Sequence, residues 1–149
     1  MITQPIGSVS ASWMCQPGLF NVEGRSLQLE ELSQYPILLN SSGAGSIYGG
    51  WLRQNGFTPV KTLMSNSVVA LVSLAVSGLG ITYLQTPSFS HLVEMGLLVE
   101  LDVHPKLPEL EYAAMYRSSR SSTFMHSLVD LAKSSCDFDR MLPLVPPTK

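Results

Sequence analysis

The chain has 149 residues, of which 45% are hydrophobic and 13% are charged, and its formal net charge is −2. A composition of this kind indicates one globular domain and excludes disordered, collagen-like and coiled-coil chains. The slightly negative charge excludes a strongly basic, nucleic-acid-binding character for this chain. The longest apolar stretch, Val68 to Leu84, is broken by serine and glycine and falls short of the roughly 18 continuous apolar residues of a membrane span.

Two cysteines, Cys15 and Cys136, are too few for a disulfide scaffold, which leaves free thiols in a reducing cytoplasm or a single bridge as alternatives. The first fourteen residues lack the basic start and apolar core of a signal peptide. The charged fraction is about half of the roughly 25% that is usual for soluble domains. A surface with so little charge is expected to be partly covered by another chain, so we predict an oligomer.

In chain order, the residues at 8–17 alternate small and large side chains as a strand does, up to a Pro-Gly turn. Ser26, followed by regularly spaced leucines, predicts a capped helix that must end before Pro36. A short buried strand is predicted at 37–39. A serine-glycine loop then leads to a helix that Ser46 caps and that Gly56 ends in the left-handed conformation.

In the second half of the chain, predicted strands and helices continue to alternate. A strand at 60–64 precedes the Ser-Asn-Ser cluster at 65–67, which is typical of a helix N-cap and opens a helix running to Ser77. The remaining predicted elements are strands at 79–84, 97–103 and 112–116, and helices at 87–95 and 122–135. Strands that alternate with helices require crossover connections, so the predicted fold class is α/β with a mainly parallel sheet.

The predicted helix that begins at Val68 contains no charged residue in its first nine positions. A helix on the surface of a globular domain would show polar positions with a period of 3.6 residues. Either this helix is enclosed within one subunit, or one side lies on the sheet and the other side meets a partner subunit. The second alternative predicts a homo-oligomer with Val69, Val72 or Val76 at the contact.

The sequence offers no arrangement for catalysis or metal binding. His91, His104 and His126 are far apart and have no cysteine or acid at ligand spacing, so we expect no metal and no cofactor. A G-x-S-x-G elbow and a P-loop are absent, so no catalytic residue is predicted. The glycine-rich loop at 43–49 has the wrong spacing for a dinucleotide and lacks the acid expected about 20 residues later. A loop of this kind at a helix N-terminus can instead hold a small anion.

Three segments of the sequence resemble a known family. Residues 65–82, SNSVVALVSLAVSGLGIT, resemble the apolar helix and Gly-x-Gly strand of LysR-type transcriptional regulators. Residues 27–40 resemble the segment that precedes this helix in the family, and 91–98, HLVEMGLL, the segment that follows it. The resemblance covers nearly the whole chain. Gln85 stands where the family usually has proline, and Pro17-Gly18 replaces a His-Pro sequence.

The resemblance implies an effector domain with the two-lobed fold of type 2 periplasmic binding proteins, incomplete at the N-terminus of lobe one. It assigns 1–14 to the end of lobe one and the first crossing strand, 15–80 to lobe two, and 81–149 to the second crossing strand and the return to lobe one. The winged helix-turn-helix domain that binds DNA in the family is outside this sequence. We therefore interpret the chain as a fragment that could complete lobe one by swapping with another copy.

The implied function is the sensing of a small, anionic effector in the cleft between the lobes, without enzymatic activity. The expected ligand-binding residues lie on two loops and one strand: Asn40, Ser41, Ser42, Gly43, Asn66, Ser67, Thr82 and Tyr83. The polar residues of both loops are also suited to helix capping, which we favour for Asn66 and Ser67, whereas we favour ligand contact for Asn40 to Ser42.

The resemblance also implies a cytoplasmic homodimer without membrane contact, which meets DNA only through the domain that this chain does not include. Two alternatives from other classes stay open at this stage. One is an extracytoplasmic solute-binding protein, which has the same two-lobed architecture, and the other is a nucleotide-binding α/β enzyme.

Overall fold

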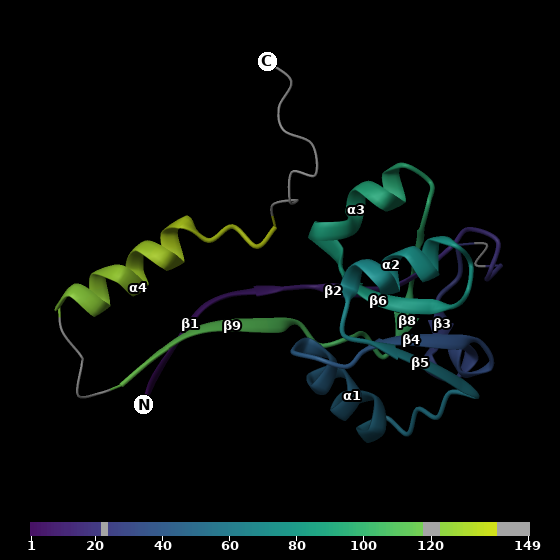
Figure 1. Ribbon diagram of the computed structural model, residues 1–149, viewed down its shortest axis with the longest axis horizontal. Helices are drawn as coiled ribbons and strands as arrows, with labels where there is room; N and C mark the ends of the chain where they lie inside the picture. Colours follow the sequence, from purple (N-terminus) through teal and green to yellow (C-terminus); the bar gives the residue numbers. More distant parts are fainter. Residues whose placement is uncertain (22–23, 118–122, 140–149) are drawn as a thin grey trace, which may run out of the picture.

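The computed structural model describes residues 1–21, 24–117 and 123–139 (Figure 1). Its strands are β1 (Ile2–Val9), β2 (Ala11–Cys15), β3 (Leu27–Gln28), β4 (Pro36–Asn40), β5 (Lys61–Ser65), β6 (Ile81–Gln85), β7 (Val99–Leu101), β8 (Val103–His104) and β9 (Leu110–Tyr116). Its helices are the 3-10 helix η1 (Leu29–Gln34) and the α-helices α1 (Ala44–Gln54), α2 (Val68–Val76), α3 (Thr86–Glu94) and α4 (Thr123–Ser135). Within the described residues no helix is long and apolar enough to cross a membrane.

A five-stranded sheet with the order β5-β4-β6-β2-β7 forms the centre of the larger body in Figure 1. Strand β4 pairs in parallel with both β5 and β6, whereas β2 pairs antiparallel with β6 and β7. Helix α1 covers one face of this sheet, and α2 and α3 cover the other (Figure 1). The sheet is therefore mixed, and not mainly parallel as the alternation of elements predicted, because β2 runs against both of its neighbours.

Alternating side chains along each strand divide the core into two layers. Trp13 and Ile37 belong to the hydrophobic cluster that includes α1 residues, whereas their neighbours Met14 and Leu38 belong to the cluster that includes Leu71 of α2. The central strands β2, β4 and β6 are largely apolar on both faces, as expected where helices bury both faces of a sheet.

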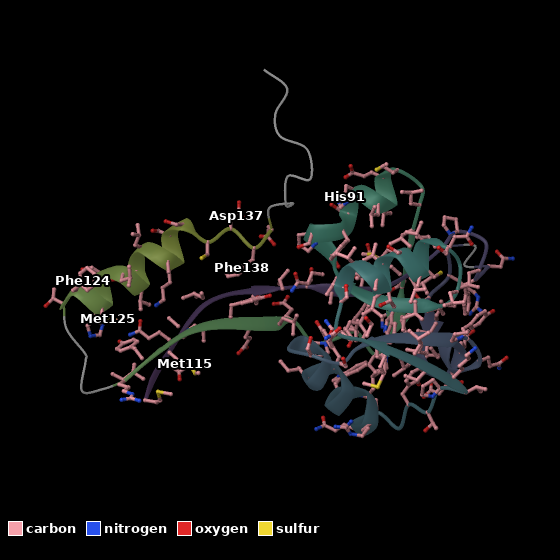
Figure 2. All side chains as sticks on the ribbon, viewed as in Figure 1. His91, Met115, Phe124, Met125, Asp137 and Phe138 are labelled. Carbon is pink, nitrogen blue, oxygen red and sulfur yellow. The ribbon has the colours of Figure 1, made fainter. Side chains whose placement is uncertain are left out.

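Strands β1 and β9 form a separate two-stranded antiparallel ribbon that extends away from the sheet, with α4 along one side (Figure 1). The register shifts between Pro5 and Gly7, which indicates a bulge. Val129 is the buried residue of α4, and Phe138, after the helix, stacks on Tyr112 of β9 with ring centroids 4.8 Å apart. Figure 2 shows Phe138 on the segment that follows α4, beside the ribbon. The ribbon and α4 thus form a unit that the chain connects to the larger body from β1 to β2 and from β8 to β9.

Several predicted elements are confirmed, and four differ, one of them the strand predicted at 97–103, which is divided between β7 and β8. The helix predicted from Ser26 is instead the strand β3, which pairs in parallel with β8, followed by the short helix η1. The strand predicted at 8–17 is divided between β1 and β2. Helix α1 begins at Ala44 with Gly43 as its N-cap, so Ser46 lies inside the helix and is not its cap.

The position of α2 agrees with the prediction. Ser67 is its N-cap, and its hydroxyl accepts a hydrogen bond of 3.3 Å from the backbone N–H of Ala70. The division into lobes stays a prediction. The resemblance assigns the residues from 81 onward to the second crossing strand and the return to lobe one. In the structure β6 and β7 lie in the same sheet as β4 and β5, because β6 pairs with β4 and β2 pairs with both β6 and β7.

Candidate ligand-binding site

A cavity of about 190 Å³ lies where the parallel strands β4 and β6 end. Its lining comes from seven elements: Ala11, Asn40, Tyr48, Val68, Leu71, Tyr83, Leu84, Gln85, Ser88, Phe89 and Leu110. Asn40 is the last residue of β4 and Gln85 the last residue of β6, so both stand at the carboxyl edge of the sheet. This edge is where open α/β sheets commonly bind ligands, because the loops and helix N-termini converge there.

Tyr83 is the most informative residue of the cavity wall. Its side chain is 7% exposed, and its ring packs edge-on against Trp13 and at 4.5 Å from the ring of Tyr48. Its hydroxyl makes no hydrogen bond of normal geometry. Burial raises the pKa of Tyr83, and the neighbouring backbone of Asn40 partly offsets this effect. A buried hydroxyl without a partner is unfavourable, so this atom marks a place where a bound molecule can supply the missing hydrogen bond.

The second tyrosine of the wall is satisfied within the protein. The hydroxyl of Tyr48 donates a hydrogen bond of 3.2 Å to the carbonyl of Pro108. Burial, together with the nearby Tyr83 and Tyr112, raises the pKa of Tyr48 to about 12. Both cavity tyrosines are therefore neutral near pH 7.

Two side-chain amides at the cavity have their orientations set by hydrogen bonds. The Oδ1 atom of Asn40 accepts from the backbone N–H and the hydroxyl of Ser42, at 3.0 and 3.1 Å, which leaves its N–H groups for other contacts. The Nε2 atom of Gln85 donates to the hydroxyl of Tyr112 at 2.9 Å, and its Oε1 accepts from Ser88 at 3.4 Å. Asn40 therefore presents a donor and Gln85 an acceptor.

The residues predicted from sequence divide into three groups. Asn40 and Tyr83 line the cavity. The loop residues Ser41, Ser42, Gly43, Asn66 and Ser67 are exposed and outside the lining. The two loops are nevertheless adjacent, because the backbone N–H of Ser41 donates to the carbonyl of Ser65 at 2.9 Å.

Thr82 has a different place from the one predicted. It is fully buried in the sheet, and its hydroxyl donates to the carbonyl of Leu38 at 3.0 Å. It is outside the cavity lining, which on this strand begins one residue later, at Tyr83, and continues to the strand end at Gln85.

Sequence reasoning missed Tyr48, Gln85, Ser88 and Phe89 as cavity residues. The departure at Gln85 was the one available signal, since a polar residue replaced the usual proline. Tyr48 and Phe89 gave no signal, because each belongs to an apolar helical pattern that predicts core packing equally well. All the lining residues carry neutral side chains. Within the described residues, no three histidines, cysteines or acids are grouped to hold a metal ion.

Comparison with known proteins identifies the family. A family model described as the LysR substrate binding domain matches residues 1–137. The chain belongs to this family. The resemblance inferred from residues 65–82 is thereby confirmed, and neither the solute-binding protein nor the nucleotide-binding enzyme is favoured. A search of curated protein sequences gives no match.

Solved structures of LysR-family regulators share the fold of this LysR substrate-binding domain. The regulatory domain of MetR from N. meningitidis, in a mutant form with two cysteines replaced by serine, is 15% identical with a TM-score of 0.73. The CcmR regulatory domain of Synechocystis PCC6803, in complex with 2-PG, is 16% identical with a TM-score of 0.72, and the effector-binding domain of QuiR, in complex with shikimate, is 14% identical with a TM-score of 0.70.

These three alignments each cover 89% of this chain and 65%, 65% and 64%, respectively, of the matched chains. The chain thus spans less than two thirds of the length of these regulatory domains. The α/β fold of the type 2 periplasmic-binding-protein kind, predicted from the resemblance, is confirmed.

Proposed function

We propose that this LysR substrate-binding domain binds a small-molecule effector in the cavity at Tyr83, and that this binding controls transcription through a DNA-binding domain outside this chain. The buried hydroxyl of Tyr83 carries the proposal, because this residue lines the cavity and its hydroxyl makes no hydrogen bond of normal geometry. The complexes of CcmR with 2-PG and of QuiR with shikimate support it, because both hold small molecules on the same fold.

The effector carries an anionic group that meets the loop at Asn40, Ser41 and Ser42. This loop leads into the N-terminus of α1, and the neighbouring loop caps the N-terminus of α2 at Ser67. Helix N-termini place unpaired backbone N–H groups and partial positive charge together. They can therefore attract an anion even though no cationic side chain lines the cavity. Gly43 and Asn66 belong to the same two loops and are further proposed contacts.

The domain acts as a sensor and not as an enzyme. General acid–base catalysis needs a group whose pKa lies near the working pH. The titratable lining residues are Tyr48 and Tyr83, whose pKa values burial raises further above neutrality. Binding without turnover is therefore the function that this wall supports, in the cytoplasm, where a regulator meets its DNA.

A titration with the whole chain tests the site. Sulfate, phosphate, succinate and benzoate are added in turn, and binding is followed by thermal shift and calorimetry. Tyr83→Phe and the double variant Ser41→Ala/Ser42→Ala should each raise the dissociation constant of the tightest-binding anion about fivefold. This is the effect expected for one lost hydrogen bond of about 1 kcal/mol. Ser127→Ala, an exposed serine of α4, is the matched control and should leave affinity unchanged. Unchanged affinity in both test variants would contradict the assignment.

We also propose that the domain forms a homodimer through α2 and the edge strand β5. Val69 is 76% exposed, and Met64 on β5 is also exposed, whereas Val72 and Val76 pack partly against the core. Burying exposed valine side chains contributes about 1.5 kcal/mol or more each, which favours association. Exposure thus favours Val69 among the three predicted contact residues.

Sedimentation at micromolar concentration tests the dimer. Val69→Asp should convert a dimer to a monomer, because it places a charge in the apolar contact. Leu131→Asp, at a side chain of α4 that is 60% exposed, is the matched control and should leave the dimer intact. A parent chain that is already monomeric would refute this assembly.

A further inference from the structure

The cavity is large enough for a small ring. Its volume is about 190 Å³, and an apolar protein cavity of about 150 Å³ is enough to bind benzene. One six-membered ring with a small substituent therefore fits this space.

The wall is shaped and composed for a ring. The rings of Tyr48 and Tyr83 lie 4.5 Å apart and tilted by 56°, and together they form an aromatic wall. Leu71 and Phe89, on α2 and α3, add hydrocarbon from the other face of the sheet. A ring loses its contact with water against such surfaces, whereas a ligand that is polar throughout would lose hydrogen bonds there.

The polar atoms are few, and they stand at the strand ends. Asn40 offers amide N–H groups, and the hydroxyl of Tyr83 lacks a partner. These atoms suit a group that accepts hydrogen bonds, and a carboxylate accepts several at once. Gln85, whose Nε2 atom is held by Tyr112, turns its acceptor Oε1 toward Ser88 and not toward a carboxylate.

We propose that the cavity takes a small carboxylic acid built on a single six-membered ring, an inference that rests on the proposed effector-binding function. The ring lies against the tyrosines, Leu71 and Phe89, and the carboxylate meets Asn40 and the hydroxyl of Tyr83. A rigid ring also loses less conformational freedom on binding than an open chain of the same size.

The test compares acids of equal carbon number on the full chain. Benzoate, cyclohexanecarboxylate and heptanoate each carry seven carbons and one carboxylate, so they differ in ring closure and not in charge. Calorimetric titration should give dissociation constants for both ring acids at least fivefold below that of heptanoate. Benzamide, which has the ring without the charge, should bind at least fivefold more weakly than benzoate.

A variant locates the ring. Phe89→Ala should raise the dissociation constants of both ring acids at least fivefold and change that of heptanoate by less than twofold. Circular dichroism verifies that the variant is folded. Phe124→Ala, at an exposed ring of α4, is the matched control and should change neither (Figure 2).

The outcomes separate this inference from the function on which it rests. Heptanoate binding as tightly as the ring acids, and weakened by Tyr83→Phe, would overturn the ring preference and leave the effector site in place. Ring acids whose affinity is the same in Tyr83→Phe and Phe89→Ala as in the parent would bind elsewhere, which overturns the inference. Binding of none of the acids, nor of succinate, sulfate and phosphate, would refute the effector site and the inference together.

Discussion

The side-chain amide of Gln85 donates a hydrogen bond of 2.9 Å to the hydroxyl of Tyr112 and thereby joins the cavity wall to the β1–β9 ribbon. The ring of Tyr112 stacks in turn on Phe138, with the ring planes 19° apart. A side chain that lines the cavity is thus in contact, through one hydrogen bond and one ring stack, with the segment that follows α4.

Removing this hydrogen bond should lower stability modestly. Tyr112→Phe keeps the stack on Phe138 and deletes the acceptor, so the free energy of unfolding should fall by about 1 kcal/mol in urea denaturation. Gln85→Leu should lower it by a similar amount. The double variant should lose clearly less than the sum, because both changes remove the same bond. Fully additive losses would show that the bond is absent in solution.

The stack on the ribbon depends on the absence of a side chain at Gly7. A Cβ atom at this position would lie 2.4 Å from the ring of Phe138, so Gly7→Ala must push the ring away. We expect a loss of about 1 to 3 kcal/mol in thermal or urea unfolding. Phe138→Ala should lower the free energy of unfolding by about as much. In the double variant, Gly7→Ala should then cause almost no further loss of stability. A full additional loss in the double variant would contradict this account.

Substitution by alanine should change stability in opposite directions at Gly80 and Gly49. A Cβ atom at Gly80 would lie 2.4 Å from the backbone carbonyl oxygen of Pro36, which cannot move without disturbing β4, so Gly80→Ala should cost about 3 kcal/mol or more. At Gly49, in α1, the nearest atom is the side-chain nitrogen of Arg53 at 3.7 Å. Gly49→Ala should therefore raise helix stability by up to about 1 kcal/mol. Equal effects in calorimetry would refute the packing argument at Gly80.

The carboxylate of Asp102 should contribute stability that acid removes. Hydrogen bonds from Lys106 and Ser26 lower its pKa from 3.8 to about 2. The folded-state pKa lies below the unfolded value, so the contribution is present above about pH 4 and is lost as the pH falls toward 2. Asp102→Asn should lower the melting temperature at pH 7 and make less difference at pH 2.5. Lys106→Met should reproduce most of the loss at pH 7, and a difference that is the same at both pH values would count against the ion pair.

The two cysteines should differ sharply in reactivity. Burial raises the pKa of the Cys15 thiol to about 11, whereas Cys136 is exposed. Because the thiolate is the reactive form, a disulfide reagent at pH 8 should modify one thiol in the folded chain and two in urea. Cys136→Ser should leave none reactive in the folded chain. Rapid labelling of Cys15 without denaturant would mean that the sheet opens at β2.

Elements whose signals are local could be predicted from the amino-acid sequence. Helix α2 is an example, because Ser67 supplies its cap and an unbroken apolar run supplies its length. The order of elements also sufficed for the family, since the apolar helix and Gly-x-Gly strand stand at their usual places. At the site, two of the residues that the sequence suggested for ligand binding, Asn40 and Tyr83, line the cavity, and their contact with a ligand stays a prediction.

Other features depend on pairings between distant segments, and the folded chain alone reveals them. Leu27 belongs to a strand, and not to the predicted helix, because it pairs with Val103. Nothing in the sequence favours Tyr83 over its neighbour Thr82, yet Thr82 is buried with its hydroxyl bonded to a backbone carbonyl of β4, whereas Tyr83 lines the cavity. Phe89 joins the same wall from a separate helix. Local propensity specifies where a helix or strand forms, but the face that each side chain occupies follows from strand register and helix packing, which no short stretch of sequence contains.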